Sequence, residues 1–164
     1  MFRTMRRSKQ QLTREECIAI LQRGSSGVLA VAGDDGYPYA VPLSYVYENG
    51  SLWFHGAAAG HKTDAILQNG KVSFCVVDRD EVIPEKLTTA YRSVIVFGKA
   101  SILEDEQEIR AAARAIGRKY SPNMDDKIEQ EIKIEFPHMA IVRLDMEHMT
   151  GKEGLELYQA RNNK

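Results

Sequence analysis

Two turn signals in the first third of the chain join three apolar segments into consecutive hairpins. Asp35-Gly36 follows an apolar run over 27–33, and Asn49-Gly50 separates the apolar runs over 39–47 and 52–56. Asp-Gly and Asn-Gly pairs favour the tight turns that connect antiparallel strands. We therefore predict a meander of three antiparallel strands, and the absence of a regular strand-helix alternation argues against a parallel sheet.

The rest of the chain mixes helical and strand-like patterns. Thr13 and Glu16 form a Thr-x-x-Glu capping box that predicts the start of a helix. The charged segment 78–89 has no periodicity and is expected to form a loop. The predicted helices cover 13–23, 61–69, 104–120 and 124–134, and the further strands cover 71–77, 91–103 and 138–145.

These elements favour a mainly β (α+β) fold, an antiparallel barrel with peripheral helices. Gly98 lies in the middle of a long predicted strand, where it indicates the bend or bulge by which a sheet closes. The 164 residues suit a single domain over 1–164. Residues 1–11 are expected to form a flexible N-terminal tail, and residues 153–164 a loose C-terminal tail.

Composition limits the classes of partner. The net charge is −1, with 22 basic and 23 acidic residues, and this balance argues against binding to nucleic acid or to an anionic membrane. No apolar run approaches the roughly 18 residues of a membrane span. Cys17 and Cys75 lack short-spaced companions, which is typical of buried thiols in a reducing compartment. We therefore expect a soluble cytoplasmic protein.

A Gly-bracketed loop before the second predicted helix is the best candidate for binding chemistry. Gly56 and Gly60 allow close approach of a ligand to the backbone, and His61 and Lys62 place donors at a helix start, where an anion is favoured. This arrangement suits an aromatic ligand that carries a phosphate. On residue type alone, Lys62 also fits a solvated helix lysine and His55 a structural histidine, so both interpretations stay open.

The histidines do not predict a metal site. His55 and His61 are six residues apart with no acidic residue or cysteine between them, and His138 and His148 are ten apart. Neither spacing matches a common zinc motif. The sequence also lacks the Gly-rich motifs of nucleotide triphosphatases and of dinucleotide-binding domains.

Three blocks of the chain resemble a known family. They are Pro38–Tyr47, Leu52–Ala57 and Gly60–Lys62, and weaker similarity extends over Met5–Arg7, Gly27–Ala30, Val94–Ala100 and Met149–Lys152. In these blocks the chain is similar to the flavin-binding split-barrel proteins of the pyridoxamine-5'-phosphate oxidase-like superfamily, and most of all to its nitroimidazole-resistance (Nim-type) branch. The resemblance implies a six-stranded antiparallel split β-barrel with peripheral α-helices.

The resemblance also implies a cofactor and its contacts. FMN would lie across the second and third strands, against Phe54 and His55, with its phosphate held by Gly60, His61 and Lys62. The isoalloxazine and ribityl contacts would come from the second strand, at Ala40, Val41, Pro42, Leu43 and Ser44. The family forms homodimers with two flavins at the subunit interface. Residues that would reach the partner's flavin are Arg92, Ser93, Val94, Thr150, Gly151 and Lys152.

The function implied is that of an FMN-dependent oxidoreductase that reduces a small electrophile such as a 5-nitroimidazole-type nitroaromatic. His55 is the candidate catalytic residue, as a proton donor or positioning group, because histidine exchanges protons near neutral pH. Three alternatives are a non-catalytic flavin- or haem-binding sensor, a pyridoxamine-phosphate-oxidase-like enzyme, and a binding domain without cofactor. The missing C-terminal Arg-x-His pattern argues against vitamin B6 oxidation.

Overall fold

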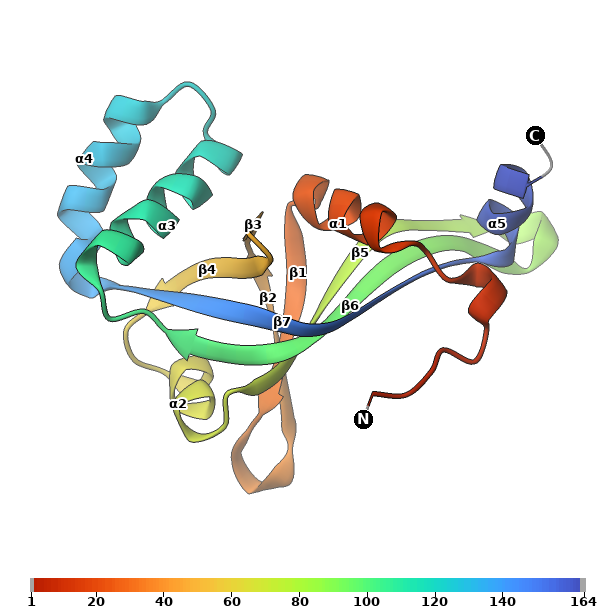
Figure 1. Ribbon diagram of the computed structural model, residues 1–164, viewed down its shortest axis with the longest axis horizontal. Coiled ribbons are helices and arrows are strands. Elements are labelled where there is room, and N and C mark those ends of the chain that lie inside the picture. The colour runs from red at the N-terminus through yellow and green to blue at the C-terminus, as the bar shows by residue number, and fades with distance from the viewer. Residues whose placement is uncertain (1, 163–164) are drawn as a thin grey trace.

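The chain folds around one antiparallel sheet, which a computed structural model describes together with its helices for residues 2–162. Within these residues the sheet has seven strands in the order β2-β1-β5-β6-β7-β4-β3 (Figure 1). The strands are β1 (Ser26–Ala32), β2 (Pro38–Ser44), β3 (Val46–Glu48), β4 (Ser51–Ala57), β5 (Lys71–Ile83), β6 (Thr88–Ile102) and β7 (Met139–Glu153). The helices are α1 (Arg14–Arg23), α2 (His61–Gln68), α3 (Glu106–Tyr120), α4 (Asp125–Glu135) and α5 (Leu155–Asn162).

The predicted strand over 39–47 is two strands, and this is why the sheet has seven strands instead of the expected six. Tyr45 interrupts it, so that β2 lies at one edge of the sheet and β3 at the other. A single residue therefore joins the two edges. β3 pairs with β4 through the Asn49-Gly50 turn as predicted, but β2 pairs only with β1, so the expected three-stranded meander is wrong.

The interior of the curled sheet is the main hydrophobic core. Inward-facing residues alternate along the strands, and α1 and α2 add apolar side chains to the same core. Its fully buried members include Leu29, Leu52, Phe54, Phe74, Val94, Val96 and Leu144. A second, smaller core lies outside the barrel, where α3 and α4 pack on β4 and β7 around Ile141.

Helix signals in the sequence were reliable. Thr13 caps α1 in a reciprocal capping box with Glu16, and the backbone N–H of Glu16 donates to the Thr13 hydroxyl at 3.2 Å.

The pairing of β6 with β7 shifts register next to Gly98, which confirms the predicted bulge. A Cβ atom at position 98 would lie 2.1 Å from the carbonyl oxygen of Asp145, so only glycine fits there.

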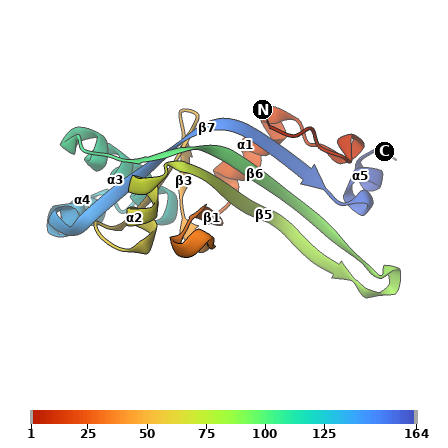
Figure 2. The same cartoon turned by 90° about the horizontal axis from the view of Figure 1, so that it is seen from below.

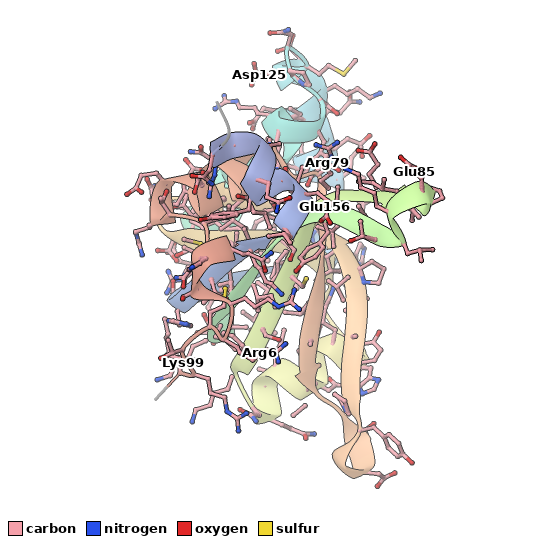
Figure 3. The ribbon with its side chains drawn as sticks, turned by 90° about the vertical axis from the view of Figure 1, so that its right-hand side faces the viewer. Arg6, Arg79, Glu85, Lys99, Asp125 and Glu156 are labelled. Carbon is pink, nitrogen blue, oxygen red and sulfur yellow. The ribbon has the colours of Figure 1, made fainter. Side chains whose placement is uncertain are left out.

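The expected loop over 78–89 is instead a continuation of β5 and β6. These strands stay paired as far as Ile83 and Thr88 and form an arm that extends away from the barrel (Figure 2). Charged side chains are tolerated there because the arm is exposed on both faces. Its tip carries Leu87, which is 96% exposed. In Figure 3, Glu85 marks the tip and Arg79 the base of the arm, beside α5 with Glu156.

The expected tails are partly structured. Residues 155–162 form α5, so the prediction of a loose C-terminal tail is wrong for this stretch, and residues 163 and 164 lie outside the described part. The helix is held by Arg161, whose guanidinium forms an ion pair with the buried carboxylate of Glu153 at 2.9 Å. At the other end, Gln11 forms a β-bridge to Lys152 and Gln10 is buried, so only residues 2–7 of the expected tail precede the first turn.

The two cysteines are free, but only one is fully buried. Cys17 lies in the core, where burial raises the pKa of its thiol to about 11. Cys75 is half-buried on the outer side of β5. No helix among residues 2–162 is long and apolar enough to cross a membrane.

A line of ion pairs connects the arm, β7 and α5. Glu153 has no exposed surface and is contacted by Arg92 at 3.2 Å and by Arg161 at 2.9 Å. Arg92 also lies 3.5 Å from Asp78, which pairs with Arg23 at 2.7 Å. Because a buried carboxylate is costly without partners, this arrangement depends on both arginines.

We predict that Glu153→Gln destabilises the protein by about 2 kcal/mol, because the amide loses two charge-assisted contacts. Urea unfolding followed by circular dichroism measures the change. The control is Glu85→Gln at the exposed tip of the arm, which should alter stability by less than about 0.5 kcal/mol. Equal stability of the two variants would show that the buried ion pairs contribute nothing.

Candidate functional site

The sheet is open between β2 and β4, and we call this opening the seam. Near Tyr45 the two strands lie close to each other, but no ladder of hydrogen bonds joins them. Their far ends diverge, and α2 lies between them (Figure 1). The sequence-predicted site residues on β2, β4 and α2 are therefore brought to one opening of the barrel.

The residues of β2 divide between two environments. Ala40, Pro42 and Ser44 are exposed on the outer side of the sheet, whereas Val41 and Leu43 are half-buried and pack against the core. The first three can offer side chains to a ligand. Val41 and Leu43 lie opposite Leu29 and Gly27 in the hydrogen-bonded pairs of the ladder with β1, so their backbone groups are already engaged. The backbone groups that this edge strand leaves free belong to the alternate residues, Ala40, Pro42 and Ser44.

On β4, Phe54 and His55 point in opposite directions. Phe54 is fully buried in the barrel and stacks on Phe74, so its side chain is not accessible to a ligand. His55 is exposed on the outer side, where it pairs in register with Ile141 of β7. Of these two predicted site residues, only His55 presents a functional group at the surface.

Lys62 lies against the end of β4. A Cβ atom at Gly56 would be 2.4 Å from the Lys62 ammonium, so the lysine side chain lies where a side chain at position 56 would point. Burial lowers the pKa of Lys62. No carboxylate among residues 2–162 lies within 4.0 Å of its ammonium. A half-buried cation without an acidic partner is well suited to bind an anion.

His61 lies on the other side of the helix start, toward β2. Its ring stacks on Tyr39 with centroids 4.1 Å apart, and its Nε2 lies 3.7 Å from a carboxylate oxygen of Asp34. Gly60 precedes it with φ of 132°, a backbone conformation that glycine adopts easily. His61 and Lys62 thus attach α2 to the two sides of the seam.

The second set of predicted residues is adjacent in space. Arg92, Ser93 and Val94 on β6 pair in register with residues 153, 152 and 151 of β7. Not all are available to a ligand. Val94 is buried, Arg92 is engaged by the carboxylates of Asp78 and Glu153, and Gly151 is covered by α1, since a Cβ atom there would lie 2.3 Å from the sulfur of Cys17.

The remaining members of that set lie on an apolar surface. We call it the outer sheet face: the outward-facing residues of β2, β1, β5, β6 and β7. One row crosses all five strands, from Pro42 through Val28, Cys75 and Ile95 to Thr150. Val28 and Ile95 are 40% and 39% exposed. An exposed apolar sheet surface of this kind is typical of an interaction site.

Sequence reasoning missed a cavity of about 720 Å³ between the end of β4 and the α3–α4 pair. His55, Gly56 and Ala57 form one wall, and most of the rest comes from the two helices. No motif indicated this cavity, because α3 and α4 show ordinary amphipathic patterns. Two of its lining residues are the histidines His55 and His138, but their distance in the sequence gave no signal that they share a cavity.

Comparisons with known proteins agree with this architecture. A family model described as pyridoxamine 5'-phosphate oxidase matches residues 13–153. A search of curated proteins found no match.

Solved structures with a similar fold come from several bacteria. A conserved hypothetical protein of Mycobacterium tuberculosis has a TM-score of 0.81 and 20% identity, over 94% of this chain and 92% of that one. A candidate 5-nitroimidazole antibiotic resistance protein of Bacteroides thetaiotaomicron has a TM-score of 0.71 and 21% identity, over 87% and 86%. An FAD- and haem-binding protein of Mycobacterium smegmatis has a TM-score of 0.77 and 18% identity, over 93% and 80%. At these identities the likeness establishes the fold.

Proposed function

Because the chain belongs to the pyridoxamine 5'-phosphate oxidase family, we propose that it binds a flavin, FMN, along the seam. The observation that carries this proposal is the position of Lys62. Its ammonium is half-buried, has no acidic partner among the described residues, and lies where a side chain at Gly56 would be. A phosphate there would also meet His61 and the N-terminal end of α2. The exposed residues of β2 would then contact the ring and ribityl parts of the flavin.

We further propose that the protein is an oxidoreductase that reduces a small electrophile, such as a nitroaromatic compound. When bound, FMN supplies the electron-transfer chemistry. His55 is the proton donor in this proposal, which is supported by its exposed side chain beside the seam and in the lining of the cavity under α3 and α4. Ala57, the next residue of β4 on the same side, is small and leaves room for an acceptor.

The outer sheet face supports a homodimer. Its apolar row places Pro42 on the same surface as Ser93, Thr150 and Lys152, so a second copy on this face would bring its own β6 and β7 toward the seam of the first. The exposed arm, with Leu87 at its tip, adds apolar surface that a partner would cover. We propose a C2 dimer with one flavin at each of two equivalent sites.

The flavin proposal is tested by the visible absorption spectrum of the purified protein and by titration with FMN. We predict a yellow protein, or a colourless one that takes up FMN and becomes yellow. A protein that neither carries nor binds FMN contradicts the proposal and favours a domain without this cofactor.

Lys62→Met should weaken FMN binding by about 10- to 100-fold, or roughly 1.4–2.7 kcal/mol, because a charge-assisted contact to the phosphate is lost. Riboflavin, which has no phosphate, should bind both proteins equally. The melting temperature without ligand should not fall, because burial of the unpaired ammonium is unfavourable. The control is Lys86→Met on the arm. Equal loss of FMN and riboflavin affinity would place the phosphate elsewhere.

His55→Ala should slow single-turnover oxidation of the chemically reduced protein by a 5-nitroimidazole about 100-fold, with unchanged flavin content. His55→Gln keeps a hydrogen-bonding group but cannot supply the proton, so it should be equally slow. Full activity in His55→Gln would make His55 a positioning residue. If the wild-type protein binds FMN and is not oxidised by any acceptor tried, the non-catalytic alternative is favoured.

Ile95→Lys should convert the dimer to a monomer in light scattering at micromolar concentration, because a charge would be buried within the apolar row. Leu67→Lys on α2, where the leucine is 71% exposed away from this surface, is the matched control and should remain dimeric. A monomeric wild-type protein, or a dimeric Ile95→Lys variant, rules out this interface.

A further inference from the structure

The cavity between β4 and the α3–α4 pair has the size of a small-molecule site. Its volume of about 720 Å³ lies within the roughly 300–1,000 Å³ range of ligand pockets. Apolar residues form most of its lining. They include Ala113 and Ile116 from α3, Met124, Ile128 and Ile132 at α4, and Met139 at the start of β7.

The polar side chains of the cavity are those of Ser121, two histidines and three charged residues of α4. His55 and His138 contribute imidazole rings that can donate or accept hydrogen bonds. On α4, Lys127, Glu131 and Glu135 follow each other at intervals of four residues and therefore lie along one face of the helix. None of these three forms an ion pair within residues 2–162.

The charges of this α4 face select against anions. Two carboxylates and one ammonium leave a net charge of −1 at the rim of a cavity with an apolar lining. A carboxylate or phosphate on a ligand would be repelled and also desolvated there. An uncharged molecule is neither repelled by the carboxylates nor penalised by loss of a charged group's hydration. Its polar substituent can form a hydrogen bond with His55 or His138.

We propose that this cavity binds an uncharged, largely apolar small molecule whose polar substituent contacts His55 and His138, and that Glu131 and Glu135 exclude anionic analogues. The wall formed by His55, Gly56 and Ala57 separates the cavity from Lys62 by the thickness of one strand. A role of the cavity as the site of the electron acceptor rests on the proposed function. The binding itself needs no flavin.

Trp53 provides a direct measurement, since it is the chain's one tryptophan. It lies two residues before His55 on the same side of β4 and packs in the core beneath α3 and α4. Nitroaromatic probes quench tryptophan fluorescence at short range. We therefore use 4-nitrobenzamide as the uncharged probe and 4-nitrobenzoate as an anion of nearly identical shape.

We expect saturable quenching by 4-nitrobenzamide and at least tenfold weaker binding of 4-nitrobenzoate. In the double variant Glu131→Gln and Glu135→Gln, binding of 4-nitrobenzoate should strengthen at least fivefold, with little change for 4-nitrobenzamide. Both substitutions lie on the exposed side chains of α4, so the fold should be retained. Equal affinity for the two probes in the wild-type protein overturns the proposed charge selection.

Ala57→Leu fills part of the cavity and should weaken 4-nitrobenzamide binding at least tenfold, whereas Ala59→Leu, two residues along and outside the lining, should not. Isothermal calorimetry of the same proteins gives affinity without fluorescence. Unchanged binding in Ala57→Leu, or no saturable binding to the wild-type protein, overturns the proposal. FMN uptake, measured separately, is expected to be unchanged in all variants, so failure of the cavity proposal is distinguishable from failure of the flavin proposal.

Discussion

The structure depends on the way the chain turns at Tyr45, because this residue joins the two edges of the sheet. Its ring has no exposed surface and packs edge-on against Phe74 with centroids 5.1 Å apart. Its backbone N–H donates to the Tyr120 hydroxyl at 2.8 Å, and its carbonyl accepts from the Lys119 ammonium at 2.8 Å. The end of α3 thus satisfies the backbone groups that the break in the strand leaves without a ladder partner. The barrel is closed at this point.

Closure at one end and divergence at the other explain where the candidate site lies. β2 and β4 separate as they leave Tyr45, and α2 fills the space between their far ends with buried Thr63, Ala65 and Ile66. The same helix brings Lys62 into a half-buried position where its charge is unfavourable without an anion. A site of this kind lowers the free energy of unfolding of the unliganded protein, and binding of an anion raises it again.

Local signals in the sequence predicted most helices and turns, whereas features that depend on contacts between distant parts of the chain were missed. The Asn49-Gly50 turn, the Thr13 capping box and the Gly98 bulge each act within a few residues, and all three are confirmed. The break at Tyr45 was missed because its cause, α3, lies some 75 positions away. Tyr39 of β2 and His61 of α2 lie in contact, so two of the sequence blocks are neighbours in space, and their binding role stays a prediction. The burial of Phe54 was not foreseen, because the inner face of a strand depends on how the whole sheet curls.

The α3–α4 pair shows how the second site arises from small residues. Gly117 lets the helices approach closely, since a Cβ atom there would lie 2.8 Å from Ile128. On the solvent side the pair is held by Arg118 and Asp125 at 2.7 Å. Toward the helices, Ala57 is too small to fill the space beneath them, and the cavity remains. Gly56 serves the opposite side of β4, because the Lys62 ammonium lies where its side chain would be, so the strand itself separates the candidate phosphate site from the cavity.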